Sequence, residues 1–212
     1  MRSCPAILSP LPFVLAIYLQ LAVKTATNYT IDDTYGDSRT GQHALYQPNN
    51  IWWTQTCTGF QPLPDASHTM NKTFHAATWS SGPELNITIN FIGTAIFVFF
   101  NLVDDPLAFS SQVITTNAVN FIVDSIPALQ FQYIPTRQNQ FLFQHSVFTK
   151  DNLKDGTHTL VITGPPKGGA DIYVNFDYAI YTHSGNLLNE LPPTTVLGTN
   201  VSPPESKVTP PL

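Results

Sequence analysis

Two adjacent tryptophans and a nearby tyrosine are the residues of this chain best suited to contact a sugar. They are Trp52, Trp53 and Tyr46. An exposed aromatic ring offers a flat apolar surface for the apolar face of a pyranose, and side-chain amides bind hydroxyl groups. Asn and Gln occur four times between residues 47 and 55. The alternative is structural, because adjacent residues of a strand point to opposite faces and one tryptophan is then a core residue.

A second candidate site is acidic. Asp32, Asp33 and Asp37 fall in a short turn beside Gly36, and Asp177 lies on a strand expected near the end of the folded region. Calcium takes several oxygen ligands, and short Asp-rich loops supply them. A structural calcium ion held by these four carboxylates is one interpretation, although EF-hand spacing is absent. The other is that the aspartates cap turns and accept hydrogen bonds from loop backbone.

The sequence carries no constellation that identifies a reaction. Asp104 and Asp105 form a carboxylate pair, but a glycosidase needs two acids that face each other across a cleft. Adjacent acids before Pro106 are more typical of a turn. The six histidines lack metal-ligand spacing, and the GxSxG, HExxH and glycine-rich phosphate motifs are absent. We therefore expect no catalytic residue.

Hydrophobic periodicity predicts the elements that position these residues. Residues 85–91 alternate between apolar and polar, which is typical of a strand with one wet face. Residues 94–100 are almost continuously apolar, which suits a strand covered on both faces, and Gly93 is placed to supply the tight turn between the two. Residues 171–182 alternate over their whole length. Their expected apolar face consists of Ile172, Val174, Phe176, Tyr178 and Ile180. No stretch shows a helical period, so the pattern predicts an all-β sandwich.

Composition narrows the class of partner. Charged residues make up only 11% of the 212 residues, and the net charge is −5. The nine Lys and Arg residues are scattered. A phosphate-binding surface needs clustered cations, so we expect no nucleic-acid partner.

The chain divides into three predicted parts. Residues 1–24 resemble a cleaved export signal, with Arg2 ahead of an apolar stretch at 13–23 that is too short to span a membrane. Residues 25–183 carry the strand patterning. Residues 184–212 are rich in Pro, Thr and Ser and are expected to be a disordered tail. We thus expect a secreted protein with no membrane span in the mature chain, associated with the cell wall or cell surface.

Sequons and cysteine usage agree with export. Asn28, Asn71 and Asn86 each begin an Asn-X-Thr acceptor motif for N-glycosylation, and Asn86 lies on the polar face of an expected strand. Cys4 falls in the signal, so the mature chain keeps only Cys57. A lone cysteine is either buried or free to pair with another molecule, and burial is the interpretation we favour.

Several segments, in order, resemble a family of exported proteins from mushroom-forming fungi. The chain shows its IDD…GDS…TG opening at residues 29–41, followed by Tyr46, Pro48 and Trp53. The remaining similar segments are TC…PD at 56–65, FIGTAI at 91–96, LKDGTHTL at 153–160 and FDYAIY at 176–181. The similarity covers about residues 28–182. A more distant likeness is to the galactose-binding-like jelly rolls of many carbohydrate-binding modules.

The resemblance implies a fold, an exported location and glycan contact, without an activity. The chain departs from the family's C-x-x-C pair, because Phe60 stands at the second position. It also shows a Pro-rich stretch where many members continue into a transmembrane helix. We therefore predict a jelly-roll sandwich acting as a non-catalytic extracellular module that binds cell-wall or other glycan. A cell-surface ectodomain that binds another protein is the alternative, and a glycan-active hydrolase is the third.

Overall fold

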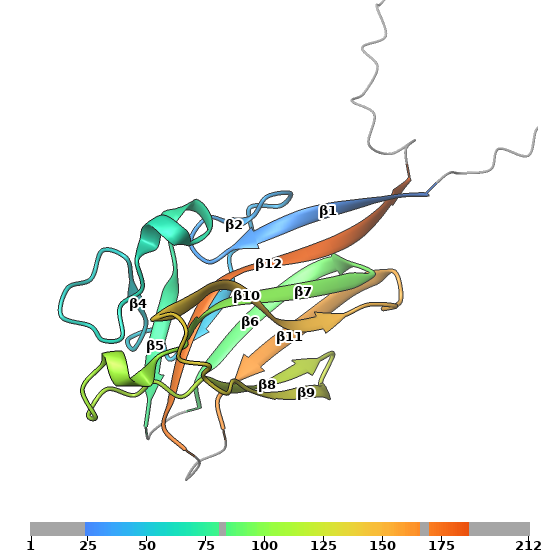
Figure 1. The fold of residues 1–212 in the computed structure, drawn as a ribbon. Helices are drawn as coiled ribbons and strands as arrows, with labels where there is room; N and C mark the ends of the chain where they lie inside the picture. Colours follow the sequence, from blue (N-terminus) through green and yellow to red (C-terminus); the bar gives the residue numbers. More distant parts are fainter. Residues whose placement is uncertain (1–23, 81–83, 166–169, 187–212) are drawn as a thin grey trace, which may run out of the picture. The chain divides into compact units, whose positions relative to one another are not determined.

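Two antiparallel β-sheets make up the computed structural model of this chain, which describes residues 24–80, 84–165 and 170–186 (Figure 1). The predicted all-β sandwich is confirmed. Within those residues the helical turns are 3₁₀ segments, η1 (Ala66–His68), η2 (Met70–Lys72) and η3 (Pro106–Ala108). None of the helices there is long and apolar enough to cross a membrane. The predicted signal, apart from Lys24, and residues 187–212 of the predicted tail lie outside the described residues.

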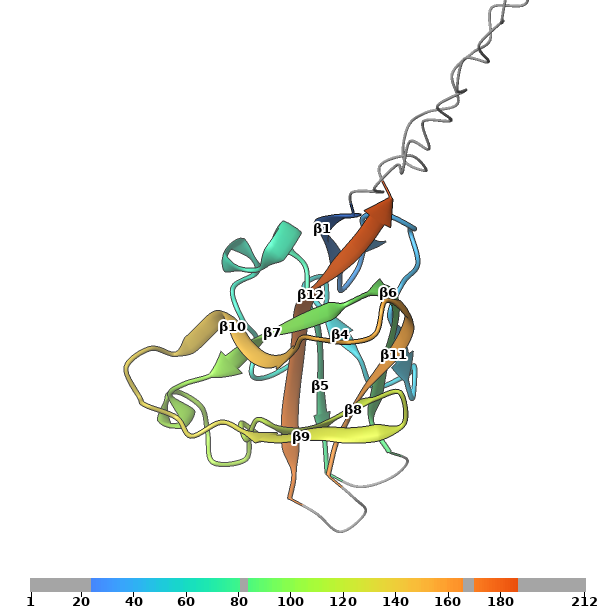
Figure 2. The same cartoon turned by 90° about the vertical axis from the view of Figure 1, so that its right-hand side faces the viewer.

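The larger sheet has seven strands, ordered β10-β7-β12-β1-β2, with β5 paired to β12 and β4 paired to β5. Its members are β1 (Lys24–Asp32), β2 (Gly36–Asp37), β4 (Trp53–Thr54), β5 (His75–Trp79), β7 (Ala95–Val103), β10 (Phe141–Lys150) and β12 (Ile172–Asn186). The predicted closing strand is therefore an interior strand, as its long apolar face indicated, and it runs through the middle of the fold (Figure 2). It extends to Asn186, beyond the predicted domain end at residue 183.

The smaller sheet has five strands, ordered β3-β6-β11-β8-β9. Its members are β3 (Leu45–Gln47), β6 (Asn86–Gly93), β8 (Ala118–Val123), β9 (Ile126–Gln132) and β11 (Gly156–Thr163). β6 and β11 pair without a register shift over their full length, and the β8–β9 pair has one shift, between Phe121 and Ile122. The register decides which side chains share a face, because residues directly opposite each other in an antiparallel pair point the same way.

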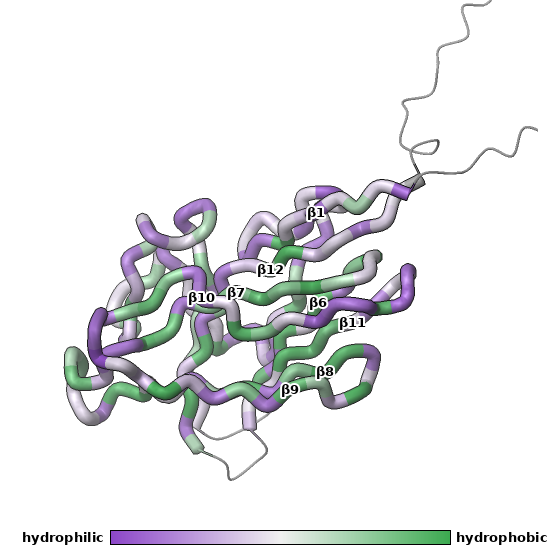
Figure 3. The backbone as a smooth tube through the Cα atoms, turned by 45° about the vertical axis from the view of Figure 1, so that its right-hand side comes forward, coloured by the Kyte–Doolittle hydropathy of each residue, from purple (hydrophilic) through white to green (hydrophobic). Residues whose placement is uncertain are grey.

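The main core lies between the sheets, where each contributes its apolar face. The alternation predicted for β6 holds, since Ile87, Ile89 and Phe91 are buried and the polar residues between them are half-buried or exposed. β7 is apolar along most of its length, as Figure 3 shows, and its residues are buried or half-buried. A second, smaller apolar cluster is centred on Phe60, Phe74 and Tyr173.

Gly93 does not adopt the left-handed backbone conformation in which a glycine often forms a tight turn. It ends β6, and β7 begins two residues later in the other sheet. A Cβ atom at this position would collide with the carbonyl oxygen of Thr182, which accepts a hydrogen bond from the Thr94 amide at 2.8 Å. Glycine is required here because the chain passes from one sheet to the other in close contact with β12.

A β-bulge in β12 corrects the face predicted for this strand. Phe176 pairs with Phe100 and Tyr178 with Phe99, so Asp177 is the extra residue. Up to Phe176 the predicted apolar face points into the main core. Beyond the bulge the alternation is reversed, and Ala179 and Tyr181 join that core instead of Tyr178 and Ile180.

Candidate functional site

The four aspartates of the predicted calcium site are all buried: Asp32, Asp33, Asp37 and Asp177. Asp32 closes a turn, because its Oδ1 accepts hydrogen bonds from the backbone amides of Thr34 at 2.9 Å and Tyr35 at 2.8 Å. Its Oδ2 accepts from Nδ2 of Asn71 at 2.7 Å. This is the turn-capping arrangement that the sequence analysis gave as the alternative to a cation.

Asp33 joins the first turn to the fifth strand. Its Oδ1 accepts a hydrogen bond from the Thr73 hydroxyl at 2.6 Å, and its Oδ2 lies 2.7 Å from Nδ1 of His75. The His75 ring stacks on Tyr46, with 4.2 Å between ring centroids. The Tyr46 hydroxyl donates in turn to the backbone oxygen of Asp33 at 2.9 Å. These contacts fix β1, β3 and β5 to one another.

Asp177 reaches the same cluster from the bulge of β12. Its Oδ1 accepts a hydrogen bond from the Met70 amide at 2.9 Å, and its backbone oxygen accepts from the Asp33 amide at 3.2 Å. Burial, aided by the charges of Asp33 and Asp32 and opposed by the Met70 hydrogen bond, raises the pKa of the Asp177 carboxyl to about 7. The carboxyl is thus partly protonated near neutral pH.

Asp37 is held by different partners. Its oxygens accept hydrogen bonds from the Arg39 amide, the Thr40 hydroxyl and the Tyr181 hydroxyl. Across residues 24–80, 84–165 and 170–186, no three His, Cys, Asp or Glu side chains are arranged to hold a metal ion. Calcium binding by Asp32, Asp33, Asp37 and Asp177 stays a prediction. Hydrogen bonds hold the carboxylates of Asp32, Asp33 and Asp37, whereas Oδ2 of Asp177 is buried without a partner among the described residues.

Of the three aromatic residues predicted to contact sugar, Trp53 has the most exposed side chain, at 38%. It stacks on Phe60 with 5.2 Å between centroids. Trp52 is half-buried against Tyr46. Tyr46 in turn stacks on His75 and donates a hydrogen bond to the backbone oxygen of Asp33. Trp53 on the larger sheet is therefore the most exposed of the three aromatic candidates, and its contact with sugar stays a prediction.

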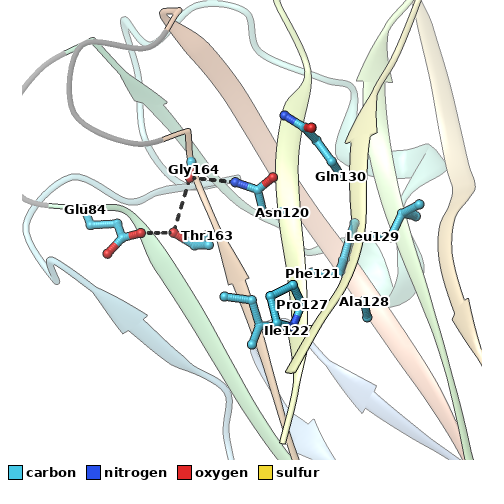
Figure 4. A pocket seen from close by; sticks show the side chains of 10 residues that line it. All are labelled: Glu84, Asn120, Phe121, Ile122, Pro127, Ala128, Leu129, Gln130, Thr163 and Gly164. Atoms are coloured by element: carbon cyan, nitrogen blue, oxygen red, sulfur yellow. Dashed lines mark hydrogen bonds between the residues drawn. The ribbon is translucent and has the colours of Figure 1, made fainter. Parts of the chain in front are cut away.

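A second surface, on the outer face of the five-stranded sheet, carries several side chains that could hydrogen-bond to the hydroxyls of a sugar. The register places five polar side chains in one row across its strands, one from each. They are Gln47 of β3, Asn86 of β6, Thr163 of β11, Asn120 of β8 and Gln130 of β9. We call this set the amide row. Glu84, which precedes β6, accepts a hydrogen bond from the Thr163 hydroxyl at 2.7 Å (Figure 4).

Two shallow hollows adjoin the amide row and share Glu84 as a lining residue. One, of about 560 Å³, contains Asn120, Gln130 and Thr163, and Figure 4 shows the side chains that line it. The other, of about 550 Å³, contains Gln47 and Asn86. We call the two together the sheet groove. Each volume falls in the range of small-ligand sites.

Apolar side chains lie beside the amide row, and charge is almost absent. The neighbouring cross-strand row consists of Leu45, Thr88, Val161, Ile122 and Pro127. The residues that line the sheet groove include one side chain that is charged at neutral pH, Glu84, and no Lys or Arg. The groove therefore offers amide groups beside apolar contacts, which suits a neutral ligand rich in hydroxyls.

Reasoning from the sequence missed the amide row. Asn86 was expected on a polar face, but its alignment with Asn120 and Gln130 depends on the pairing of strands far apart in the chain. A signal was present, because each of these residues stands at a polar position of a strand pattern. The pairing order needed to align them is not a local property.

The other residues considered for chemistry have structural contacts. Asp104 is fully buried and accepts hydrogen bonds from the loop that follows β9, and Asp105 caps η3. His158 lies 2.7 Å from Asp124 Oδ2 and 2.7 Å from the Lys154 backbone oxygen. Cys57 is a free, half-buried thiol rather than a fully buried one.

The three predicted glycosylation sites differ in their surroundings. Asn28 is exposed on β1, and its Oδ1 accepts a hydrogen bond from the Thr182 hydroxyl at 2.9 Å. Asn71 is exposed, and its amide is bonded to Asp32. Asn86 is half-buried, and its side chain makes no hydrogen bond within the part of the chain that the structure describes.

No protein-family profile and no curated protein matches this chain. Among solved structures, a cycloisomaltooligosaccharide glucanotransferase of Paenibacillus sp. complexed with cycloisomaltoheptaose is 15% identical over 71% of this chain and 19% of that chain, with a TM-score of 0.38. The Agl-KA catalytic domain is 13% identical over 76% of this chain and 28% of that chain, with a TM-score of 0.41. These similarities are too low to bear on the ligand.

Proposed function

We propose that this chain is a non-catalytic extracellular module that binds glycan in the sheet groove. The observation that carries the proposal is the amide row, which presents amide side chains from four strands, with the buried Thr163 between them, beside a mostly apolar row. Amides both donate and accept, so they match the hydroxyls of a sugar, which do the same. With strands about 4.8 Å apart, the row spans about 19 Å from β3 to β9. That length accommodates a chain of several sugar rings.

The extracellular location rests on the sequence. The signal-like residues 1–24 and three Asn-X-Thr sequons support it. We also infer kinship with the exported fungal family from the order of its motifs. Two of these motifs fall where the fold is most constrained, since FIGTAI crosses between the sheets at Gly93 and FDYAIY contains the β12 bulge.

A polysaccharide and oligosaccharide binding panel with the secreted domain tests the proposal, followed by titration calorimetry on any ligand found. Replacing Asn120 and Gln130 together by alanine removes two hydrogen-bonding groups and should weaken binding by about 1–3 kcal/mol. Both side chains lie on the outer face, so the melting temperature should change little. Absence of binding across the panel, by the secreted domain and also by a variant that lacks the Asn86 sequon, would contradict the proposal.

Trp53→Ala is the matched control, because Trp53 belongs to the larger sheet. We expect this variant to bind as the parent does. A loss of about 1–3 kcal/mol in Trp53→Ala, with the Asn120 and Gln130 variant unaffected, would instead assign binding to an aromatic platform.

A protein partner is the second candidate, and exposed apolar residues on the β8–β9 edge favour it. Ile126 is 69% exposed, Leu129 is 44% exposed, and Ile134 in the following loop is 81% exposed. β9 is the last strand of its sheet, and an exposed apolar edge is a common docking element. Ile126→Ser with Ile134→Ser should abolish cross-linking to a cell-surface protein and leave glycan binding intact. Unchanged cross-linking would exclude this edge.

A further inference from the structure

The Asn86 side chain stands inside the amide row. It is paired with Gln47 on β3 and with Thr163 on β11, so each of the two neighbouring strands places one member of the row next to it. From the strand spacing of about 4.8 Å, Asn120 is about 10 Å away and Gln130 about 14 Å away. A bulky group attached to the Asn86 amide leaves the sheet on its outer face, directly beside the sheet groove that Asn86 lines.

The same residue begins the sequon Asn86-Ile87-Thr88. In β6, Asn86 and Thr88 point to the outer face, while Ile87 is fully buried. The Asn86 amide is free of hydrogen bonds among the described residues, whereas that of Asn71 donates to Asp32. Asn86 can thus carry a sugar on Nδ2 without breaking a contact of the folded chain.

We propose that an N-linked glycan at Asn86 lies in the sheet groove and excludes external ligand, so that occupancy of this sequon controls binding. An N-linked chain begins with neutral sugars, and the groove offers neutral amides and apolar contacts without a cation. The attached glycan acts at high effective concentration, because it is tethered beside the groove. The exclusion of external ligand rests on the proposed function, whereas the placement of the attached glycan does not.

Thr88→Val tests the proposal on the full chain secreted from a glycosylation-competent host. It removes the sequon, keeps the Asn86 side chain, and conserves the volume of Thr88 on the outer face. Thr30→Val is the matched control, because it removes the Asn28 sequon on β1 in the other sheet. Peptide mass spectrometry gives the occupancy of each site, and a parent that is unoccupied at Asn86 would overturn the proposal.

The first readout is the side-chain amide NMR signals of Asn120 and Gln130. We expect them to differ between the parent glycosylated at Asn86 and Thr88→Val, and to be unchanged in Thr30→Val. This readout needs no external ligand. Identical signals in the parent and Thr88→Val would overturn the placement of the glycan, whatever the chain binds.

The second readout is the affinity for the neutral oligosaccharide that binds best in the panel. Thr88→Val should bind it at least about tenfold more tightly than the glycosylated parent, and Thr30→Val should match the parent. Equal affinities in the parent and Thr88→Val overturn the inference but leave the proposed function standing. Absence of binding in Thr88→Val as well contradicts the proposed function, and the NMR readout then decides the placement alone.

Discussion

Asp104 is a fully buried carboxylate whose hydrogen bonds fix the loop between β9 and β10. Its two oxygens accept from the Tyr133 hydroxyl at 2.7 Å, from Thr136 through both amide and hydroxyl, and from the amides of Gln138 and Asn139. Burial acts to raise the pKa of Asp104, but these hydrogen bonds outweigh it and hold the pKa well below its usual range. The residue considered for catalysis is thus an anchor for a loop.

Asp104→Ala should lower the free energy of unfolding by about 2–4 kcal/mol, because five donors of the loop lose their shared, buried acceptor. The contribution of the ionised carboxylate is present above the usual Asp pKa of about 4 and is lost as the pH falls through the lower pKa of the folded state. Urea unfolding at pH 7 measures the loss. Asp105→Ala is the control, since Asp105 caps only a 3₁₀ turn. Equal effects of the two substitutions would contradict this role.

Asp177 has the opposite pH dependence. Its pKa of about 7 exceeds the usual value, so its favourable contribution is fully present below about pH 4 and is lost as the pH rises through 7. Asp177→Asn keeps an oxygen for the Met70 amide and cannot ionise. We expect this variant to lose less stability than the parent between pH 5 and pH 8, by an amount on the order of a few kcal/mol. Melting curves across this range, with Asp105→Asn as control, measure it; profiles that superimpose would refute the assignment.

At the scale of the element, β12 shows where the alternation of apolar and polar residues along a strand no longer predicts which side chains are buried. Phe176 lies before the bulge and is fully buried against Phe100, whereas Ile180 lies after it and is half-buried. Phe176→Ala should therefore cost about 3–5 kcal/mol of stability, and Ile180→Ala clearly less. Denaturant unfolding of the two variants checks this. Equal costs would mean that the strand keeps one apolar face throughout.

How much the sequence predicts depends on how local the determining contacts are. The alternation in β6 predicted its buried face, because the period of a strand is a property of consecutive residues. The bulge at Asp177 was not predicted, since it arises where β12 meets both β5 and β7. The amide row was not predicted either, because its register is set by pairs such as Asn86 with Thr163, which are 77 positions apart in the sequence.

The acidic cluster joins three elements, namely the β1–β2 turn, η2 and β12. Because hydrogen bonds from Thr34, Asn71 and Thr73 satisfy Asp32 and Asp33, we expect the cluster to be stable without a cation. Excess chelator should leave the melting temperature of the secreted domain unchanged, and added calcium should not raise it. A melting temperature that falls with chelator and recovers with calcium would establish the predicted calcium site instead.

At the scale of the whole molecule, the chain combines a low charged fraction of 11% with a net charge of −5. The compact unit from Thr25 to Gly185 contains both sheets and the sheet groove. The surface of the sheet groove is therefore more neutral than the chain as a whole, with Glu84 as the one residue charged at neutral pH among those that line it. Specificity should come from hydroxyl matching and shape rather than from charge.

Salt dependence distinguishes these two sources of specificity. Affinity for a neutral oligosaccharide should change by less than about twofold between roughly 0.05 and 0.5 M salt, because no ion pair forms and screening has nothing to act on. A uronic acid analogue of the same ligand should bind more weakly at low salt, since Glu84 and the net negative charge repel it, and salt should reduce that difference. Glu84→Gln should narrow the gap between the two ligands at low salt. Calorimetry on both ligands measures these affinities, and a neutral ligand whose binding weakens steeply with salt would show that a charged surface outside the sheet groove carries the contact.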